Sequence, residues 1–257
     1  MESSPHPDVT VSLGDDHVAT IEIDRGPENY LDVDLATGLA DTIELLESEA
    51  GCRAIVLASK GKHFCAGARL SADDQGPTDR NPLYAQAARL FAGSVPIVAA
   101  VQGAAIGAGL GLAMVADFRV GAPEARFAAP FARLGFHQGF GLSVTLPATI
   151  GGQRAAELLY TGRRIDGATA AAIGLVDRVV ALDDLRSAAH DLAAEIAGSA
   201  PLAVESIRAT LRGDLADRVA AATDHELAEQ TWLRKTDDFK EGVAATHDRR
   251  LPNWAGK

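Results

Sequence analysis

The chain has 257 residues, of which 47% are hydrophobic, and a formal net charge of −11 at pH 7. An acidic chain lacks the basic face that nucleic-acid phosphates require, so these values argue against a nucleic-acid-binding protein. The length and hydrophobic content suffice for a large core, either in one domain with a helical appendage or in two domains.

The two cysteines, Cys52 and Cys65, are too few for a disulfide framework and lack the paired spacing of a metal site. A reducing cytosol is therefore the expected compartment. The start of the chain, MESSPHPDV, contains neither the basic nor the apolar region of a signal peptide. We expect a cytoplasmic protein without a bound metal.

The first part of the chain predicts the order strand, strand, helix, strand. Apolar and polar residues alternate over 9–13 and 17–23 around the turn Gly14-Asp15-Asp16, which predicts a β-hairpin. Apolar residues recur at helical spacing over 35–46, and RAIVLAS at 53–59 is typical of a buried strand.

The stretch PIVAAVQGAAIGAGLGLAMVAD at 96–117 is apolar but contains four glycines, each of which would destabilise a helix interior by about 1 kcal/mol relative to alanine. We favour a strand over 97–102 that enters a glycine turn and opens a helix near Gly109, with free backbone N–H groups facing a ligand. A dinucleotide fingerprint fails because Leu112 stands where its third glycine is required. A membrane-spanning helix would need basic flanks and fewer alanines and glycines, so we expect no membrane span.

The rest of the chain continues the alternation and then becomes mainly helical. A loop at 60–70 and an acidic segment at 71–82 precede a helix at 83–91, and a short strand at 118–120 follows the central stretch. Further helices are predicted at 142–150, 153–160, 168–173, 185–197, 202–211, 216–233 and 239–245, with a last strand at 176–180. This pattern predicts an α/β fold whose final helices cover the body or meet a partner subunit.

Two glycine-containing turns, which end at Ala68 and Ala108, belong to separate strand-helix units. If both strands lie in one sheet system, the backbone N–H groups of these alanines can polarise a single carbonyl oxygen. Such an oxyanion hole stabilises charge in a transition state, with each donor worth about 2.7–4 kcal/mol. The spacing equally allows the small residues to serve only close packing.

Four ordered motifs extend this pattern: HFCAGARL at 63–70, IVAAVQGAAIGAGLGLAMVADFRV at 97–120, ARF at 125–127 and LLYTGRRIDGATAAAIGLVDRVV at 158–180. From about Val9 to the last helices, the chain resembles the crotonase superfamily, also called the enoyl-CoA hydratase/isomerase family. The resemblance implies a crotonase-like spiral of ββα units over 1–195 and a helical C-terminal trimerisation region over 196–257. It also implies a homotrimer or a dimer of trimers.

The same resemblance implies an acyl-CoA thioester as substrate and no tightly bound cofactor, with the thioester oxygen accepting from the N–H groups of Ala68 and Ala108. The family uses two loops around the nucleotide, and in this chain those loops carry Arg25, Lys62 and Arg69. They would supply local positive charge to the anionic nucleotide although the chain as a whole is acidic. Arg69 departs from the family pattern, in which an aspartate commonly follows the Ala68 position. The other predicted substrate-binding residues are Cys65, Ala66, Gly67, Leu70, Gly107, Gly111, Phe131 and Gly139.

The positions of proton transfer depart furthest from the family. Family hydratases use two glutamates to add water across an α,β-double bond; Gly111 and Phe131 stand there in this chain. Gly139 stands where dehalogenase-like relatives carry an aspartate. His137 and Tyr84 are the candidates for proton transfer, although a loop histidine is often structural and Tyr84 could serve only as a pocket wall.

We therefore predict an acyl-CoA enzyme that stabilises a thioester enolate, by family most often an enoyl-CoA hydratase, a lyase of fatty acid metabolism. Because both hydratase acids are missing, two alternatives stay open. One is a different enolate reaction, such as isomerisation, decarboxylation or C–C bond cleavage. The other is a protein that binds acyl-CoA without turnover.

Overall fold

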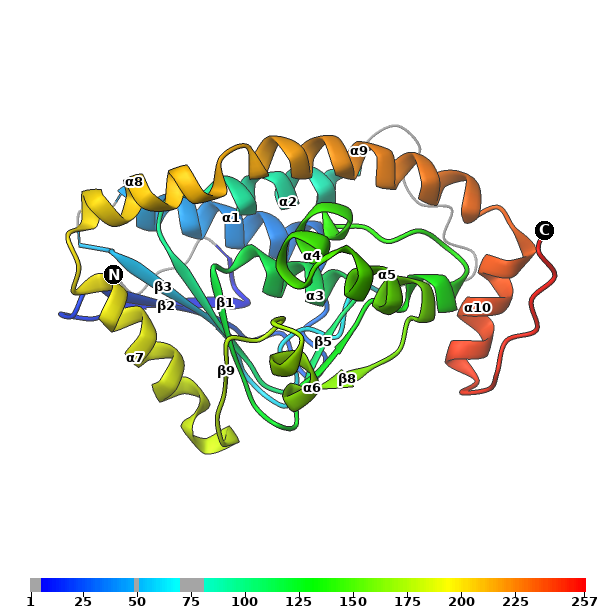
Figure 1. Cartoon of the computed structure of the whole chain (residues 1–257), viewed down its shortest axis with the longest axis horizontal. Coiled ribbons are helices and arrows are strands. Elements are labelled where there is room, and N and C mark those ends of the chain that lie inside the picture. Colours follow the sequence, from blue (N-terminus) through cyan, green and yellow to red (C-terminus); the bar gives the residue numbers. More distant parts are fainter. Residues whose placement is uncertain (1–5, 49–50, 70–80) are drawn as a thin grey trace.

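The fold was analysed in a computed structural model that describes residues 6–48, 51–69 and 81–257 (Figure 1). In this part of the chain the strands form two sheets. The larger sheet has the order β1 (Val9–Leu13), β2 (Val18–Ile23), β3 (Ala54–Ser59), β4 (Ile97–Val101), β6 (Phe118–Gly121) and β9 (Arg178–Val179), and the smaller has the order β5 (Ala104–Ile106), β7 (Arg126–Ala128) and β8 (Ile165–Asp166). Neighbouring strands are parallel except in the β1–β2 hairpin and the β7–β8 pair.

The helices surround these sheets. They are α1 (Val33–Ser48), α2 (Pro82–Ala92), α3 (Ala108–Val115), α4 (Leu142–Ile150), α5 (Gly152–Thr161), α6 (Gly167–Ala172), α7 (Leu185–Ala197), α8 (Pro201–Arg212), α9 (Leu215–Leu233) and α10 (Asp237–His247), with 3-10 turns η1 (Pro130–Leu134) and η2 (Leu182–Asp184). The predicted mixed α/β class and the helical C-terminal region are confirmed. The division at residues 195 and 196 stays a prediction.

Both faces of the larger sheet are covered, which explains why its central strands are continuously apolar. In β3, Val56 and its neighbours of the same parity pack against α7, whereas Ile55 and Leu57 face the main core beneath α1, α2 and α3. β4 continues the pattern, with Ile97 opposite Ile55 in parallel register. The helix α7 crosses β2, β3, β4 and β6 on its side of the sheet.

The central glycine stretch contains an element that the sequence did not predict. We expected a strand over 97–102 to turn directly into a helix, but β5 lies between β4 and α3. Gly103, at φ +61, turns the chain out of the larger sheet, and an added Cβ there would overlap the Lys62 carbonyl oxygen. β5 therefore starts the second sheet, and α3 follows it near the predicted position.

The C-terminal helices fold back over the same chain. In Figure 1, α8 and α9 run along one side of the molecule, with α1 and α2 beneath them, and α10 lies at the far end. Contacts join α9 to α2 and α4, and join α10 to η1. This arrangement brings the end of α9 to the site described below.

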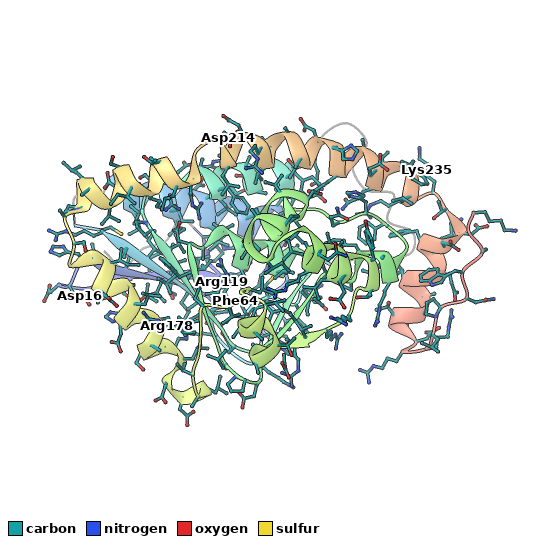
Figure 2. All side chains as sticks on the ribbon, in the orientation of Figure 1. Asp16, Phe64, Arg119, Arg178, Asp214 and Lys235 are labelled. Carbon is teal, nitrogen blue, oxygen red and sulfur yellow. The ribbon has the colours of Figure 1, made fainter. Side chains whose placement is uncertain are left out.

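A buried ion cluster fastens α8 to the sheet. The Asp117 carboxylate accepts from Arg208 Nε at 3.0 Å, from Arg212 Nε at 2.9 Å and from the Ile97 backbone N–H at 2.8 Å. Arg119, which is buried inside the protein (labelled in Figure 2), donates to the Ala116 carbonyl oxygen at 2.9 Å. The cluster places cationic groups at the C-terminal end of α3, where the helix dipole favours them.

We expect Asp117→Asn to lower the free energy of unfolding by roughly 3 kcal/mol, because it leaves two largely buried guanidinium groups without their carboxylate. Urea unfolding measures this loss. Asp214→Asn is the matched control: its partner Arg218 is 3.8 Å away and the Asp214 side chain is 70% exposed, so a change within about 0.5 kcal/mol is expected. Equal stability of the two variants would contradict a stabilising cluster.

Candidate active site

The segments that lead to Ala68 and Ala108 begin at a short parallel pairing between Cys65 and β5. The Cys65 N–H donates to the Ala104 carbonyl oxygen at 2.9 Å, and the Ile106 N–H donates to the Cys65 carbonyl oxygen at 3.1 Å. Cys65 and Ala105 are bridge partners, so Ala68 and Ala108 each follow the bridged pair by three residues. Both alanines line one cavity of about 120 Å³.

The glycines in these loops allow the close approach. Gly67 has φ +109, and a Cβ there would lie 2.9 Å from the Ile106 carbonyl oxygen; a Cβ at Gly109 would overlap the Cys65 carbonyl oxygen. Gly107, at φ 56 and ψ −117, precedes the first residue of α3, Ala108. An N–H group at the start of a helix has no partner within the helix, so that of Ala108 is suited to a ligand.

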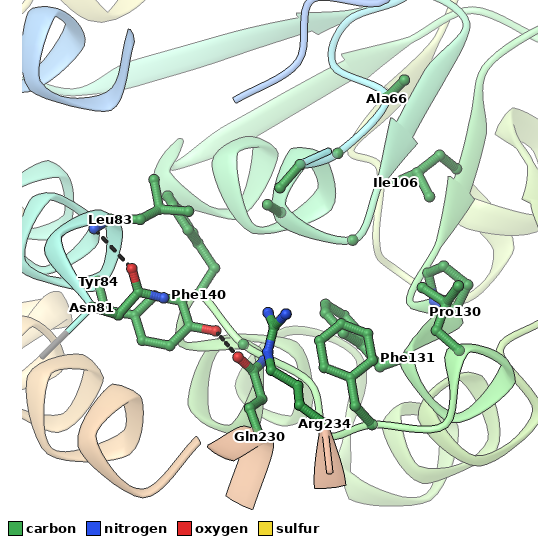
Figure 3. A pocket seen from close by; sticks show the side chains of 17 residues that line it. Ala66, Asn81, Leu83, Tyr84, Ile106, Pro130, Phe131, Phe140, Gln230 and Arg234 are labelled. Atoms are coloured by element: carbon green, nitrogen blue, oxygen red, sulfur yellow. Dashed lines mark hydrogen bonds between the residues drawn. The ribbon is translucent and has the colours of Figure 1, made fainter. Parts of the chain in front are cut away.

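The cavity is lined by apolar and polar side chains that alternate around it in Figure 3. Phe131, Phe136 and Phe140 contribute much of the apolar lining. The polar side chains that line it are Asn81, Tyr84, Gln230 and Arg234. Among the described lining residues, Arg234 carries the charge.

The hydroxyl of Tyr84 is held in a defined hydrogen-bond network. It donates to Gln230 Oε1 at 2.9 Å, while Gln230 Nε2 donates to the carbonyl oxygens of His137 at 2.9 Å and Gln138 at 3.2 Å. These carbonyl acceptors orient the Gln230 amide, so the phenolic proton points to Oε1. Burial raises the pKa of Tyr84 well above its usual value. Tyr84 is thus a neutral residue of the cavity lining, and its hydroxyl proton is already engaged in the hydrogen bond to Gln230.

Arg234, the residue directly after α9, packs against aromatic rings. Its guanidinium carbon lies 5.3 Å from the centre of the Phe136 ring and 5.4 Å from that of Phe239. Phe136 in turn makes edge contacts with Phe131 at 5.5 Å and Phe239 at 5.4 Å. This packing places the Arg234 guanidinium over the ring of Phe136, which lines the cavity.

Glu226, one helical turn before Gln230, is a fully buried carboxylate. It accepts from the backbone N–H of Gly141 at 2.9 Å and of Ser143 at 3.0 Å. Burial raises its pKa, and these hydrogen bonds oppose the shift. Glu226 thereby anchors the loop that carries Gly139 and Phe140 to α9, and it is not among the cavity-lining residues that the structure describes.

Comparison with known proteins identifies the family of the chain. The model of the enoyl-CoA hydratase/isomerase family matches residues 14–257. The chain belongs to the enoyl-CoA hydratase/isomerase family.

Relatives in this family match over nearly the whole chain. A Mycobacterium tuberculosis protein named a probable enoyl-CoA hydratase is 36% identical over 85% of this chain and 87% of its own. The carnitinyl-CoA dehydratase of Proteus mirabilis is 30% identical over 93% of this chain and 95% of its own. A crystal structure of an enoyl-CoA hydratase/isomerase from Pseudoalteromonas atlantica superposes with a TM-score of 0.86 at 31% identity, covering 96% of this chain and 100% of that one.

Other side chains occupy the space at Gly111 and Gly139, two positions where the family resemblance led us to expect acids. An added Cβ at Gly111 would lie 2.6 Å from Phe140 Cδ1 and 2.8 Å from Phe140 Cβ. At Gly139 it would overlap the Tyr84 hydroxyl and lie 2.8 Å from Gln230 Nε2. Phe131 itself lines the cavity. A carboxylate could enter at Gly111 or Gly139 only if Phe140 or Tyr84 moved.

The structure brings together most residues that the sequence predicted for the site. Ala66, Gly67, Ala68, Tyr84, Gly107, Ala108, Phe131 and Gly139 all line the cavity. Cys65 lies fully buried behind its wall, and burial raises the pKa of its thiol to about 11, as expected of a packing residue. Leu70 lies outside the described residues.

Several predicted residues lie elsewhere. His137 is not among the cavity-lining residues described; its Nδ1 lies 2.9 Å from the Gln138 carbonyl oxygen and its ring packs against His225. Arg25 pairs with Asp32 at 2.5 Å and with Asp8 at 3.1 Å.

The remaining two predicted cations lie on the surface. Lys62 is exposed, and the exposed Arg69 stacks at 5.3 Å over the Tyr30 ring. Neither side chain lines the cavity among the residues that the structure describes.

Sequence reasoning missed Asn81, Phe140, Gln230 and Arg234. Gln230 and Arg234 lie more than 120 residues after Ala108, in α9 and directly after it, and no local pattern shows that this part of the chain returns to the glycine turns. Phe140 has a left-handed φ of 61°, which is unusual for a bulky residue, so no sequence pattern predicts that its ring reaches Gly111.

We expect Gly111→Ala to destabilise the protein by up to about 2 kcal/mol. Its Cβ would overpack the base of the Phe140 side chain at a cost of about 1–3 kcal/mol, and the helix preference of alanine returns about 1 kcal/mol of this cost. Thermal and urea unfolding measure the difference. Gly152→Ala is the control, since nothing lies within 4 Å of its added Cβ; a Gly111→Ala protein as stable as this control would contradict the packing described.

Proposed function

We propose that this chain is an acyl-CoA enzyme in which the backbone N–H groups of Ala68 and Ala108 bind the thioester oxygen and stabilise an enolate-like state. The observation that carries the proposal is the matched offset of the two alanines from the Cys65–Ala105 bridge, on the wall of one cavity. Preorganised donors of this kind need no rearrangement when charge develops on the oxygen.

The reaction is proposed to differ from hydration by a glutamate pair. Hydration is the activity named for several relatives, but the space at Gly111 is filled by Phe140, and Phe131 is apolar. An enolate can also arise when a C–C bond of the substrate breaks and leaves its electron pair on the α-carbon, as in decarboxylation or retro-aldol cleavage. Decarboxylation releases CO₂ and needs no protein base, whereas retro-aldol cleavage still needs a group that takes the proton of the β-hydroxyl. The cavity therefore favours decarboxylation over hydration.

The remaining features are proposed from the family and the surface. Lys62 and Arg69 are the proposed contacts of the coenzyme A phosphates, whereas Arg25 is engaged by Asp8 and Asp32.

A homotrimer or a dimer of trimers in the cytoplasm is proposed. Leu202 and Leu211 of α8, 79% and 81% exposed, support a subunit contact there. Among the described residues no helix is long and apolar enough to cross a membrane.

We expect the wild-type protein to hydrate crotonyl-CoA roughly 10²–10⁴-fold more slowly than a family hydratase with both glutamates, because that is the usual contribution of general acid–base catalysis. The variant Gly111→Glu/Phe131→Glu/Phe140→Ala should gain activity, since Phe140→Ala makes room for the new side chain at 111. Phe140→Ala alone is the control. The assay is loss of enoyl thioester absorbance.

Wild-type hydration as fast as that of the two-glutamate relative would contradict the proposed reaction class. Binding of many acyl-CoA thioesters without turnover of any would instead support the binding-only alternative. These outcomes differ from a failure to bind acyl-CoA at all, which would contradict the whole proposal.

A further inference from the structure

Phe140 is a bulky residue in a backbone conformation that favours glycine. Its φ is +61°, and its side chain is buried. A left-handed conformation costs energy for a large side chain, so it persists where the surrounding contacts impose it, and such outliers gather at ligand-binding sites. Phe140 is one of the residues that line the candidate active-site cavity. Its ring is therefore placed to contact a ligand there.

Two side chains of α9 fix the loop on both sides of Phe140. Before this residue, Gln230 Nε2 donates to two consecutive backbone carbonyl oxygens, at 2.9 and 3.2 Å. After it, the Glu226 carboxylate accepts from the Gly141 N–H at 2.9 Å and from a second N–H two residues later at 3.0 Å. Because both ends are held by the same helix, the loop presents the Phe140 ring in one defined place.

That place is the space beside Gly111. The three heavy atoms nearest to an added Cβ at Gly111 are Cδ1, Cβ and Cγ of Phe140, at 2.6, 2.8 and 2.9 Å. Gly111 follows Ala108 by three residues in α3, so the two lie on the same face of the helix. Ala108 lines the cavity, whereas Gly111 is not among the described lining residues. An acyl group whose oxygen is bound at Ala108 therefore meets Phe140 when it extends along α3.

A second group closes the cavity next to Gly139. An added Cβ at Gly139 would overlap the Tyr84 hydroxyl. This hydroxyl donates to Gln230 Oε1 at 2.9 Å, a bond drawn as a dashed line in Figure 3. Tyr84 and Phe140 are both buried lining residues, so together they bound the cavity on its side away from solvent.

The cavity that remains is small for an acyl chain. Its volume is about 120 Å³, whereas an apolar cavity of about 150 Å³ holds one benzene molecule. By that comparison the cavity has room for about five non-hydrogen atoms, which corresponds to an acyl group of about four carbons with its carbonyl oxygen. A longer straight chain needs the space that Phe140 occupies.

We propose that Phe140 limits the length of the acyl group, so that the substrate of this site is a CoA thioester with an acyl group of about four carbons. The inference rests on the proposed acyl-CoA function and assigns to it a substrate size and a specificity-determining residue. The thioester end remains with Ala68 and Ala108.

The test compares the binding of propanoyl-, butanoyl-, hexanoyl- and octanoyl-CoA by calorimetry. A saturated chain has neither a double bond to hydrate nor a carboxylate to lose, so these thioesters bind without turnover by the reactions considered above. The wild-type protein should bind butanoyl-CoA roughly tenfold or more tightly than octanoyl-CoA, because a chain larger than its cavity forces packed side chains to move.

Variants assign the length limit to Phe140. In Phe140→Ala, octanoyl-CoA should bind at least as tightly as butanoyl-CoA, because the longer chain can occupy the space beside Gly111. Phe140→Leu should give an intermediate ratio, since leucine keeps part of the volume. Phe118→Ala is the matched control: this phenylalanine of β6 is 37% exposed and is not among the described lining residues, so the wild-type ratio should persist. The wild-type series tests the proposal even if Phe140→Ala fails to fold.

Octanoyl-CoA that binds the wild-type protein as tightly as butanoyl-CoA, or a ratio unchanged in folded Phe140→Ala, would overturn the inference. If butanoyl-CoA still binds in that case, the proposed acyl-CoA function stands and the length limit alone is wrong. If no thioester of any length binds, both proposals fail.

Discussion

The architecture of the site depends on one short parallel pairing between the segment at Cys65 and β5. Both backbone groups of Cys65 are bonded to β5, and this pairing brings the two glycine turns to one edge. It also sets the space available: Gly67 and Gly109 touch the opposing backbone so closely that a side chain at either position would overlap a carbonyl oxygen or nearly do so. Gly103 and Gly109 of the central stretch are therefore required by the close approach of another backbone, and the proposed oxyanion donors follow from the pairing at Cys65.

The cavity beyond those donors is closed by residues from distant parts of the chain. Phe140, in a left-handed conformation, fills the space beside Gly111, and Tyr84 with Gln230 fills the space beside Gly139. Glu226 fixes the loop between them to α9. Gly111 and Gly139, where the family resemblance led us to expect acids, are thus closely packed. This packing is why we connect the chain with enolate chemistry other than hydration.

Much of this fold could be predicted because the relevant signals are local. The alternation before Ile23 reflects a local hairpin. The apolar run of β3 and the glycines around Ala108 are short patterns that can be recognised in the sequence, although the contacts that require them come from distant segments. β5 was missed because a three-residue strand between Gly103 and Gly107 has no periodicity to detect. Gln230 and Arg234 were missed for a different reason: helical spacing shows that α9 is amphipathic, but only tertiary packing decides that its end reaches the cavity.

The most direct test of the oxyanion donors replaces the Ala108 backbone amide by an ester, which removes one N–H and leaves the side chain unchanged. A conjugated enoyl-CoA absorbs at longer wavelength when its carbonyl oxygen accepts hydrogen bonds, so the bound ligand reports the donors directly. The same replacement at Gly111, whose N–H already donates to the Gly107 carbonyl oxygen at 3.0 Å, controls for the loss of a helix hydrogen bond. We predict a shift to longer wavelength on binding that is reduced by the ester at Ala108 and retained with the ester at Gly111. An unchanged shift with the ester at Ala108 would contradict the account.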